Sequence, residues 1–398
     1  YAINNASAEN DTVRVGSGTY NGSLSIDVDG LTLEGAGADA TTIVGTSEIG
    51  GPSATIQVDD GSGPVRNVTI EGFTVENPNG KFGIFAGTGT TNSNNDGIGG
   101  LVIRDNVVQD VSTQSTGGAL TGGPAGIGIR ADYGTDGNPG IEISNNEIDN
   151  VEGNSGAEPV GITLKSFTGD AGFGFSSEGA DETDASSPPA TNTDIRNNEI
   201  SNIASDDGGF ATKGISVSGE FRDVDIIDNN LTGIEAGATD GDARAITLSE
   251  NGGSYVGNEY DIDGDDNGER IGPQDFDIRN NEISDVTGDA RSINFGGYEV
   301  FGDHTVSQNT INDGAVTRFA GDQPGYQPGD GDALNLVNNT FTSQTSQLYF
   351  SDGSQSADLT TVLDNNTFNA AVEVVGAQIR AEGTAPADTV VNLDTGAT

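Results

Sequence analysis

The chain has 398 residues, of which 62 are Asp or Glu and 15 are Lys or Arg, so its formal net charge is −47. This charge argues against nucleic-acid binding, which needs clustered basic residues, and the absence of cysteine excludes disulfides and cysteine-based metal or redox sites. The chain contains no run of about 18 apolar residues, so no membrane span is predicted.

High charge with few aromatic residues can indicate disorder, but short alternating runs of Ile, Val, Leu and Phe recur along the whole chain. The acidic residues are spread evenly, and only three lysines oppose them, namely Lys81, Lys165 and Lys213. Molar salt would screen this self-repulsion, because it shortens the Debye length to about 3 Å. The composition is therefore similar to that of proteins from extreme halophiles. An acidic, calcium-rich extracellular protein is the alternative interpretation.

The first repeated element reads Gly-Ile-x-apolar or a close variant of it. Its period of two predicts a short strand with one buried face. Copies begin, in chain order, at Gly83, Gly126, Gly161, Gly214, Ala245, Ser292 and Gln347.

The second repeated element is Ile-Arg-Asn-Asn-Glu-Ile, which spans Ile195–Ile200 and returns unchanged at Ile278–Ile283. Apolar residues after it, such as Ile148 and Val151, predict one more strand in each repeat. The second Asn of each copy defines what we call the Asn column: Asn106, Asn146, Asn198, Asn229, Asn281, Asn309, Asn339 and Asn366. A constant motif at variable spacing indicates a fixed strand–turn–strand unit with loops of different length.

Strands this short cannot bury a face alone, but stacked repeats give every strand a neighbour at about 4.8 Å and enclose a continuous core. Asn suits the corner of such a repeat, because it tolerates the left-handed conformation and its side chains can hydrogen-bond along the column. The sequence therefore predicts an all-β parallel β-helix.

The start of the chain adds a family resemblance. Tyr1–Ala6 resembles the end of the capping helix of the right-handed parallel β-helix, or pectin-lyase-like, superfamily, and Asp11–Tyr20 and Leu31–Gly37 resemble its first two turns. The resemblance covers nearly the whole chain and implies a right-handed solenoid. About ten coils are expected when Ala36 and Phe73 are counted with the Asn column.

The expected organisation is one β-helix domain over residues 1–398, with a cap remnant at 1–10. The last segment, Ala387–Asp394, still has the pattern of a strand. An uncovered last coil would leave an open sheet edge. End-to-end association and continuation into another domain are therefore alternatives to a simple chain boundary.

Two long loop insertions, 166–192 and 249–274, are expected to leave the same edge about 10 Å apart and to border a groove. Aromatic side chains in them can stack on sugar rings, or can equally anchor the loops on the coil. The candidate substrate-binding residues are four of these aromatic residues and one arginine outside the loops, namely Phe167, Phe173, Tyr255, Tyr260 and Arg291.

The second loop holds an acidic segment that resembles the first half of a calcium loop. Its candidate ligands are Asp261, Asp263, Asp265, Asn267 and Glu269. The match is partial, because Gln274 stands where the acidic twelfth ligand is expected. A possible Ca²⁺ site and a solvated acidic loop remain equal alternatives.

Basic residues are rare enough for their positions to stand out. Lys213, Arg244 and Arg291 each precede the Gly-Ile element directly, so they should stack in successive coils and can form a strip that binds acidic glycan. Resemblance to the lyases of the superfamily implies a Lys or Arg base with calcium, and the candidates are Lys165, Lys213 and Arg244. The competing interpretation is that each cation simply pairs with neighbouring carboxylates.

Hydrolase chemistry has less support. The polygalacturonases of the superfamily carry Gly-His-Gly and Arg-x-Lys motifs, whereas the one histidine here is His304, in Gly-Asp-His-Thr, where we expect an incidental turn residue. Candidate N-glycosylation sequons begin at Asn5, Asn10, Asn21, Asn67, Asn230, Asn338 and Asn365, although several coincide with the Asn motif.

The sequence thus predicts a secreted or cell-surface β-helix rod for adhesion, glycan binding or filament assembly in high salt. Its expected partners are a glycan or cell-surface component and further copies of itself. The alternative is a calcium-dependent polysaccharide lyase that acts on acidic glycans.

Overall fold

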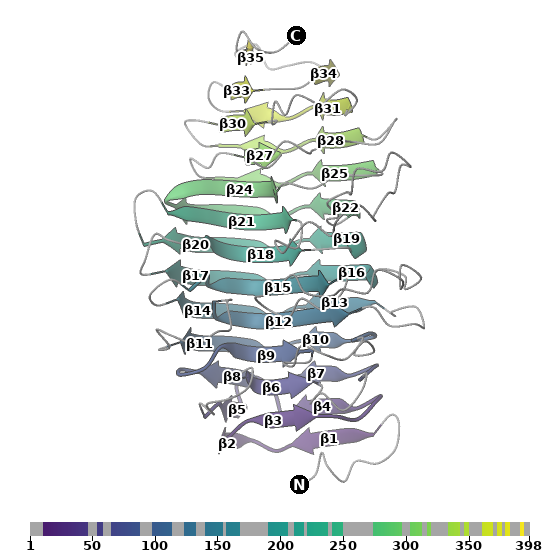
Figure 1. The fold of residues 1–398 in the computed structure, drawn as a ribbon, viewed down its shortest axis with the longest axis vertical. Helices are drawn as coiled ribbons and strands as arrows, with labels where there is room; N and C mark the ends of the chain where they lie inside the picture. Colours follow the sequence, from purple (N-terminus) through teal and green to yellow (C-terminus); the bar gives the residue numbers. More distant parts are fainter. Residues whose placement is uncertain are drawn as a thin grey trace, which may run out of the picture.

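The computed structural model shows a right-handed parallel β-helix, in which three all-parallel sheets run along one axis from the N-terminus to the C-terminus (Figure 1). The residues that it describes are 11–46, 54–58, 65–87, 98–113, 123–132, 140–153, 157–167, 190–205, 211–218, 221–237, 241–249, 274–296, 303–312, 317–319, 333–342, 346–349, 360–368, 372–375, 379–382 and 391–393. The expected cap remnant at 1–10 lies outside them. Within this part of the chain, no helix is long and apolar enough to cross a membrane.

The first sheet, sheet A, contains 12 parallel strands in the part of the chain that the structure describes, and each pairs with the strand three elements away in the chain. Its strands are β1 (Thr12–Val15), β4 (Thr32–Gly35), β7 (Thr69–Glu71), β10 (Val102–Arg104), β13 (Ile141–Ser144), β16 (Ala190–Arg196), β19 (Phe221–Ile227), β22 (Gln274–Arg279), β25 (Asp303–Ser307), β28 (Ala333–Val337), β31 (Thr360–Asp364) and β34 (Ile379–Glu382).

Sheet B contains 11 strands and follows sheet A across the corner that holds the Asn column. Its strands are β2 (Gly18–Asn21), β5 (Thr41–Val44), β8 (Thr74–Asn77), β11 (Val107–Thr113), β14 (Glu147–Gly153), β17 (Glu199–Ser205), β20 (Asn230–Ala236), β23 (Glu282–Thr287), β26 (Thr310–Ile311), β29 (Thr340–Phe341) and β32 (Thr367–Phe368). These are the strands expected after the Asn turn.

Sheet C contains 12 strands and carries the Gly-Ile elements. Its strands are β3 (Leu24–Ile26), β6 (Ala54–Val58), β9 (Phe82–Ala86), β12 (Ala125–Asp132), β15 (Val160–Phe167), β18 (Thr212–Ser218), β21 (Asp242–Ser249), β24 (Asp289–Gly296), β27 (Thr317–Phe319), β30 (Ser346–Tyr349), β33 (Val372–Val375) and β35 (Val391–Leu393).

The sheets hold more rungs than the sequence count of about ten coils. Sheet A has 12 strands, because the first rung turns through Gly16 and Ser17 and the last rung follows the final Asn motif. Neither the first rung nor the last rung has an Asn of the Asn column, so the estimate of about ten coils omitted both.

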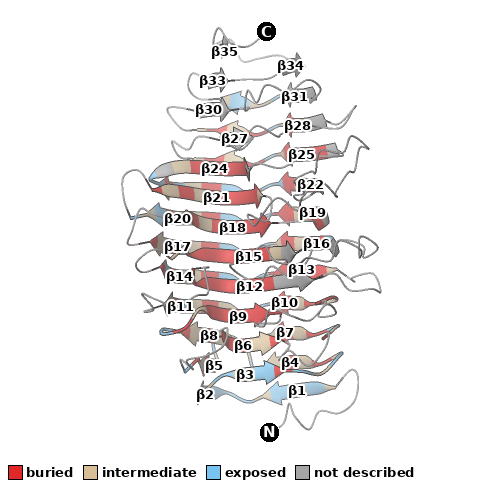
Figure 2. Cartoon of the chain, in the orientation of Figure 1, coloured by how far each residue is buried: buried red, intermediate tan, exposed pale blue. Residues whose placement is uncertain are grey.

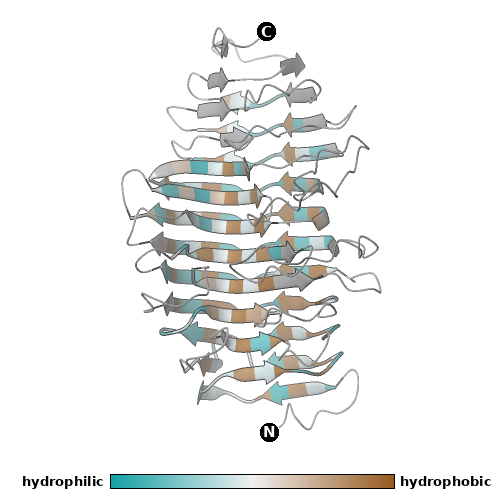
Figure 3. Ribbon diagram, in the orientation of Figure 1, coloured by the Kyte–Doolittle hydropathy of each residue, from teal (hydrophilic) through white to brown (hydrophobic). Residues whose placement is uncertain are grey.

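The core is the space that the three sheets enclose. Every second side chain along each strand points into this space and fills it. Buried positions run continuously up the rungs, and they coincide with the hydrophobic ones (Figures 2 and 3). Ile162 and Leu164 of β15 are fully buried, and in register with them lie Ile215 and Val217 of β18. Such stacking of like residues explains why the same apolar positions recur in each repeat.

The glycine of the Gly-Ile element has a steric role. A Cβ atom at Gly161 would lie 2.7 Å from Cγ2 of Ile200 in sheet B and 2.7 Å from the carbonyl oxygen of Gly214 in the next rung. Both distances are too short for a real contact, so the close approach of sheets B and C at this rung requires a residue without a side chain.

The Asn column forms the predicted hydrogen-bond ladder. Asn198 donates from its backbone N and from Nδ2 to Oδ1 of Asn229, both at 3.0 Å, and Asn229 repeats the pattern with Oδ1 of Asn281 at 3.0 Å. Each Nδ2 also donates to a carbonyl oxygen of the preceding rung, as from Asn229 to Ile195 at 2.9 Å. The side chains from Asn106 to Asn339 are buried, and their amide groups find partners in the column and in the carbonyl oxygens of sheet A.

The left-handed conformation lies one residue earlier than predicted. The residues with positive φ at this corner directly precede the Asn column: Asp105, Asn145, Asn197, Asp228, Asn280, Gln308, Asn338 and Asn365. The first Asn of the motif makes the turn, because short amide side chains tolerate this conformation, and the second Asn builds the ladder.

His304 was expected in a turn, and this expectation is wrong. It lies in strand β25 with no exposed surface, and its ring stacks on Phe276 at a centroid distance of 4.2 Å. Phe276 in turn stacks on Phe295 at 4.9 Å. Inward positions of sheet A recur every second residue, and His304 occupies one of them, so the residue belongs to the packed interior.

Candidate functional site

The outward face of sheet C is the candidate site. Because side chains alternate across a strand, Thr163 and Lys165 of β15 point away from the core that holds Ile162 and Leu164. The register extends these outward positions over neighbouring rungs as three columns. The first column is Ala54, Phe82, Ala125, Val160, Lys213, Arg244 and Arg291. The middle column is Phe85, Gly128, Thr163, Ser216, Thr247 and Asn294, and the third is Arg130, Lys165, Ser218 and Ser249.

The first column changes from apolar to cationic along the axis. Its N-terminal part packs with Phe85 as a small apolar cluster separate from the main core. The rings of Phe82 and Phe85 lie 4.6 Å apart. From β18 onward the column is Lys213, Arg244 and Arg291, so the predicted stacking of these three cations in successive rungs is confirmed by the register. We call them the cationic column.

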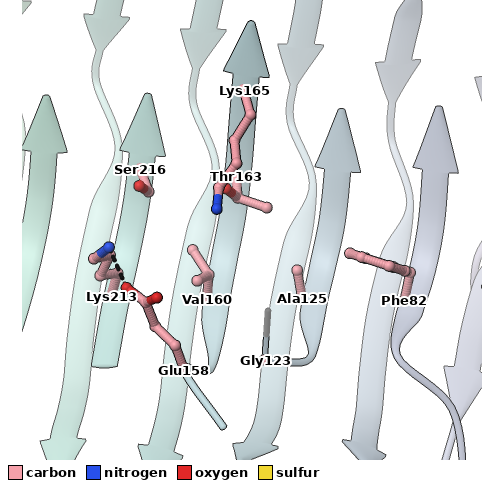
Figure 4. Close-up of a pocket in the computed structure, with 9 residues that line it drawn as sticks. All are labelled: Phe82, Gly123, Ala125, Glu158, Val160, Thr163, Lys165, Lys213 and Ser216. Carbon is pink, nitrogen blue, oxygen red and sulfur yellow. Dashed lines mark ion pairs between the residues drawn. The ribbon is translucent and has the colours of Figure 1, made fainter. Parts of the chain in front are cut away.

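Two carboxylates pair with the cationic column, one from the connection before β15 and one from the first position of β21. Lys213 forms an ion pair with Glu158, which lies just before β15 (Figure 4). Asp242 bridges the other two, with Oδ2 at 2.5 Å from Nη2 of Arg244 and Oδ1 at 3.2 Å from Nη2 of Arg291. The side chains of Lys213, Arg244 and Arg291 are only 14%, 20% and 8% exposed, so these are recessed pairs, and low exposure strengthens their fields compared with pairs in water.

A hollow lies where the apolar and cationic parts meet. It is lined by Phe82, Gly123, Ala125, Glu158, Val160, Thr163, Lys165, Lys213 and Ser216, and it encloses about 320 Å³, including space open to solvent. In Figure 4 the Lys165 side chain bends back along its strand, so that its nitrogen lies beside Thr163. The Thr163 hydroxyl is buried and has no hydrogen-bond partner, although the residue lines the hollow.

Like charges gather around this hollow. Burial lowers the pKa of Lys165, and the nearby charge of Lys213 lowers it further, although Glu158 opposes the change. Burial and the charge of Lys165 together lower the pKa of Lys81 from 10.5 to about 8. Burial alone would raise the pKa of Glu158, but Lys213, Lys165 and Arg244 outweigh it and hold the pKa below 4.5. The site therefore favours a negative charge in its centre.

The arginines of the Asn motif form a different group. Arg104, Arg196 and Arg279 lie in one outward column of sheet A and are 45%, 42% and 46% exposed. They pair with neighbouring acids, as Arg104 does with Glu71 at 2.7 Å and Arg196 with Asp194 at 2.6 Å. For these exposed cations, pairing with carboxylates is what the structure shows, and such pairs contribute little to stability.

The predicted loop insertions 166–192 and 249–274 overlap the ends of the flanking strands. β15 ends at Phe167 and β16 begins at Ala190, whereas β21 ends at Ser249 and β22 begins at Gln274. Residues 168–189 and 250–273 between them lie outside the described residues, and β15 and β21 are two strands apart in sheet C. Phe167 is the last residue of β15. Most other loop candidates lie outside the described residues, namely Phe173, Tyr255, Tyr260, Asp261, Asp263, Asp265, Asn267 and Glu269. In the part of the chain that the structure describes, no three His, Cys, Asp or Glu side chains are placed to hold a metal ion.

The sequons are exposed where the structure describes them. Asn21, Asn67, Asn230, Asn338 and Asn365 are all at the surface, and Asn5 and Asn10 lie outside the described residues. Asn67, Asn338 and Asn365 have positive φ, which gives each of them a role in a turn that needs no glycan.

Sequence reasoning missed three parts of the site: Glu158, the outward hydroxyl column and the apolar cluster at Phe82. Glu158 is two residues before a strand and belongs to no repeat, so no periodic signal marks it. A signal for the hydroxyls did exist, because the residue between the two apolar positions of the Gly-Ile element is Thr163, Ser216, Thr247 and Asn294 in successive repeats.

No family model and no curated protein sequence matches the chain. Among solved structures, the chain is similar to the A-module of mannuronan C-5 epimerase AlgE4 from Azotobacter vinelandii, with a TM-score of 0.44 and 13% identity over 98% of this chain and 90% of that one. It is also similar to the A-module of mannuronan C-5 epimerase AlgE6 from the same organism, with a TM-score of 0.41 and 13% identity over 100% of this chain and 92% of that one. The likeness is one of fold.

Proposed function

We propose that this β-helix is an extracellular or cell-surface rod that binds acidic glycans through the outward face of sheet C. The observation that carries the proposal is the recessed position of the cations on this face. Lys213, Arg244 and Arg291 are only 14%, 20% and 8% exposed. By contrast, Arg104, Arg196 and Arg279 of sheet A are 45%, 42% and 46% exposed, and the described strands of sheet B contain no Lys or Arg. Evenly spread acidity keeps a protein soluble in salt, but it does not require cations to be recessed together on one face.

The geometry suits a linear polyanion. The cationic column spans β18, β21 and β24, so its members are about 4.8 Å apart along the axis, and successive sugar acids of an extended chain can meet successive rungs. Arginine binds carboxylates in a two-pronged way, and Lys213 adds a point charge. The apolar cluster at Phe82 offers a neighbouring surface for the faces of sugar rings. The aromatic residues predicted in the two long loops, Phe173, Tyr255 and Tyr260, would extend this contact.

The rod-like scaffold and the acidic composition support the rest of the proposal. A stack of rungs with an internal amide ladder is a rigid support for presenting one binding face at a cell surface, where adhesion requires it. The composition supports operation in high salt. A Ca²⁺ ion at Asp261–Glu269 remains part of the proposal, because a divalent cation can bridge that acidic loop and a glycan carboxylate.

The test is binding of a defined oligogalacturonate, with a neutral oligosaccharide of equal length as the reference, by calorimetry at fixed ionic strength. We expect the acidic oligosaccharide alone to bind. Arg244→Gln should weaken binding at least about tenfold, because a charge-assisted hydrogen bond contributes roughly 1.5–3 kcal/mol.

Arg279→Gln is the matched control, since it removes the same charge from sheet A. Equal loss in both variants would show that binding depends on net charge rather than on the face of sheet C. Equal binding of the neutral oligosaccharide would contradict the proposal.

A lyase is the second candidate, and the lowered pKa of Lys165 favours it, because a lysine with a lowered pKa is deprotonated more easily and can serve as the base for β-elimination. Lys213 and Arg244 are the alternative bases. Release of unsaturated uronides from an acidic polysaccharide, followed by their ultraviolet absorbance, would support the lyase. Binding without such release would leave the rod as the function.

A further inference from the structure

The hollow on sheet C is unusual in holding one carboxylate among several cations. Glu158 is paired with Lys213, and the charges of Lys165 and Arg244 also act on it. This is the arrangement that a bound anion would require, with the position of the anion taken by a side chain of the protein itself.

The rest of the lining supplies hydrogen-bond donors. The Thr163 side chain is only 4% exposed, lines the hollow and has a hydroxyl without a partner. Ser216, 1% exposed, lies beside it in the middle column and lines the same hollow. Ammonium groups only donate, and a hydroxyl can turn its hydrogen toward an acceptor, so an anion can be satisfied from several sides. A buried hydroxyl without a partner is costly, which gives a ligand with acceptor atoms a gain on entry.

The Glu158 side chain is placed so that it can move away from Lys213. It lies in the connection before β15 rather than in a strand, and its side chain is 27% exposed. Rotation of this side chain away from Lys213 breaks no sheet hydrogen bond. The apolar floor formed by Val160 and Ala125 offers the carboxylate no second polar partner.

We propose that the hollow is a carboxylate-binding subsite and that Glu158 is an internal competitor, which holds Lys213 until a carboxylate of the ligand replaces it. The inference rests on the proposed function for the natural ligand, a sugar acid. The subsite itself is a property of the described residues. Exchange of one carboxylate for another keeps the buried cations neutralised throughout, and it selects against neutral sugars, which cannot replace the charge of Glu158.

The first test is rescue of Glu158→Ala by acetate. The variant should unfold at a lower temperature than the parent chain, because Lys213 and Lys165 lose their counter-charge. Sodium acetate, compared with sodium chloride at equal ionic strength, should restore stability in a saturable way by about 2 °C or more. Glu71→Ala is the matched control, since it removes an acid paired with the 45% exposed Arg104 on sheet A.

An equal effect of acetate on both variants, or equal effects of acetate and chloride on Glu158→Ala, would overturn the carboxylate subsite. Thr163→Val in the Glu158→Ala background should weaken the acetate effect, because it removes the free hydroxyl but keeps the shape. If Glu158→Ala does not fold, Glu158→Gln serves in the same measurement, since it keeps the size of the side chain and removes its charge.

The second test addresses competition. Glu158→Gln should bind oligogalacturonate about tenfold more tightly than the parent chain, because the ligand no longer has to displace a charged rival. Unchanged or weaker binding would overturn the role of Glu158 as a competitor. Acetate rescue without any binding of acidic oligosaccharide would show that the subsite exists and that the proposed function fails, so the two failures can be told apart.

Discussion

Two polar columns run along this β-helix, and they solve the problem of burial in opposite ways. The Asn column repeats in eight successive rungs, from Asn106 to Asn366, and each amide bonds to the next. The cationic column, Lys213, Arg244 and Arg291, occupies three rungs and takes its partners from Glu158 and Asp242 outside the column.

The difference follows from the chemistry of the side chains. An amide carries both a donor and an acceptor, so identical residues can satisfy one another at the spacing of a parallel sheet. Lys and Arg carry only donors, and like charges in neighbouring rungs repel. A column of amides can therefore extend without limit, whereas a column of cations persists only with counter-charges. We regard the first as structure and the second as a binding surface.

The largest effect should come from breaking the Asn column. Asn229→Ala removes the acceptor of two hydrogen bonds from Asn198, and it also removes the Nδ2 group that donates to the carbonyl oxygen of Ile195. Each buried group left without a partner costs about 1–3 kcal/mol, so we expect a loss of roughly 3 kcal/mol or more in the free energy of unfolding. Equilibrium denaturation measures it.

The neighbouring Asn230→Ala is the control, because Asn230 is exposed on sheet B and lies outside the ladder. Its stability should change by less than about 0.5 kcal/mol. Similar losses in both variants would mean that the ladder contributes no special stability, and the contrast between the two columns would fail.

The same contrast explains what could be predicted from the sequence. The fold was accessible because Ile195–Ile200 and Ile278–Ile283 repeat the same pattern, and a repeated pattern must occupy equivalent places in a solenoid. The stacking of Lys213, Arg244 and Arg291 was accessible for the same reason. Each of these residues has a fixed offset from the Gly-Ile element.

The carboxylate partner of Lys213 was not accessible. Glu158 comes from the connection before β15, so its place depends on the path of the chain rather than on a repeat. The interior position of His304 was missed because a histidine in an otherwise apolar inward column breaks the pattern that identifies the column. Residues that depart from the repeat therefore require a structure before they can be placed.

A medium effect on stability is expected from Lys81, which lies next to the apolar end of the first column of sheet C. Burial and the charge of Lys165 lower the pKa of Lys81 from 10.5 to about 8. A protonated Lys81 therefore destabilises the folded state, fully below pH 8 and progressively less as the pH rises toward 10.5. Lys81→Met keeps the apolar stem, removes the charge and should stabilise the protein at pH 7.

Melting temperatures of both chains between pH 7 and pH 10.5 test this. The advantage of Lys81→Met should shrink to a small remainder as the pH approaches 10.5, where the lysine is neutral in the folded state and half protonated in the unfolded state. A variant that is less stable at pH 7 would show that the ammonium group gains more from its contacts, such as the ring of Phe82 at 6.0 Å, than it loses by burial and repulsion.

The smallest effect on stability is expected in a third column, which consists of carboxylates. Glu142, Asp194, Asp225 and Asp277 stack in register on the outward face of sheet A. Burial raises the pKa of Asp225 above 3.8, Arg279 and Arg196 oppose the change, and Asp223 adds to it. Because the folded pKa is raised, the ionised group destabilises the fold at neutral pH, and this penalty is lost as the pH falls through the folded pKa toward 3.8.

Asp225→Asn should therefore be slightly more stable than the parent chain at pH 7, and the difference should shrink as the pH falls toward 3.8. Molar salt should remove the part that comes from Asp223 and leave the part that comes from burial, since screening acts on charge–charge interactions and not on desolvation. Denaturation in low and high salt at both ends of this pH range separates the two. A loss of stability at pH 7 would mean that Asp225 contributes to a favourable network of ion pairs with Arg196 and Arg279. A column of carboxylates would then be stabilised by the cations beside it. The rule drawn from the Asn and cationic columns would not hold for carboxylates.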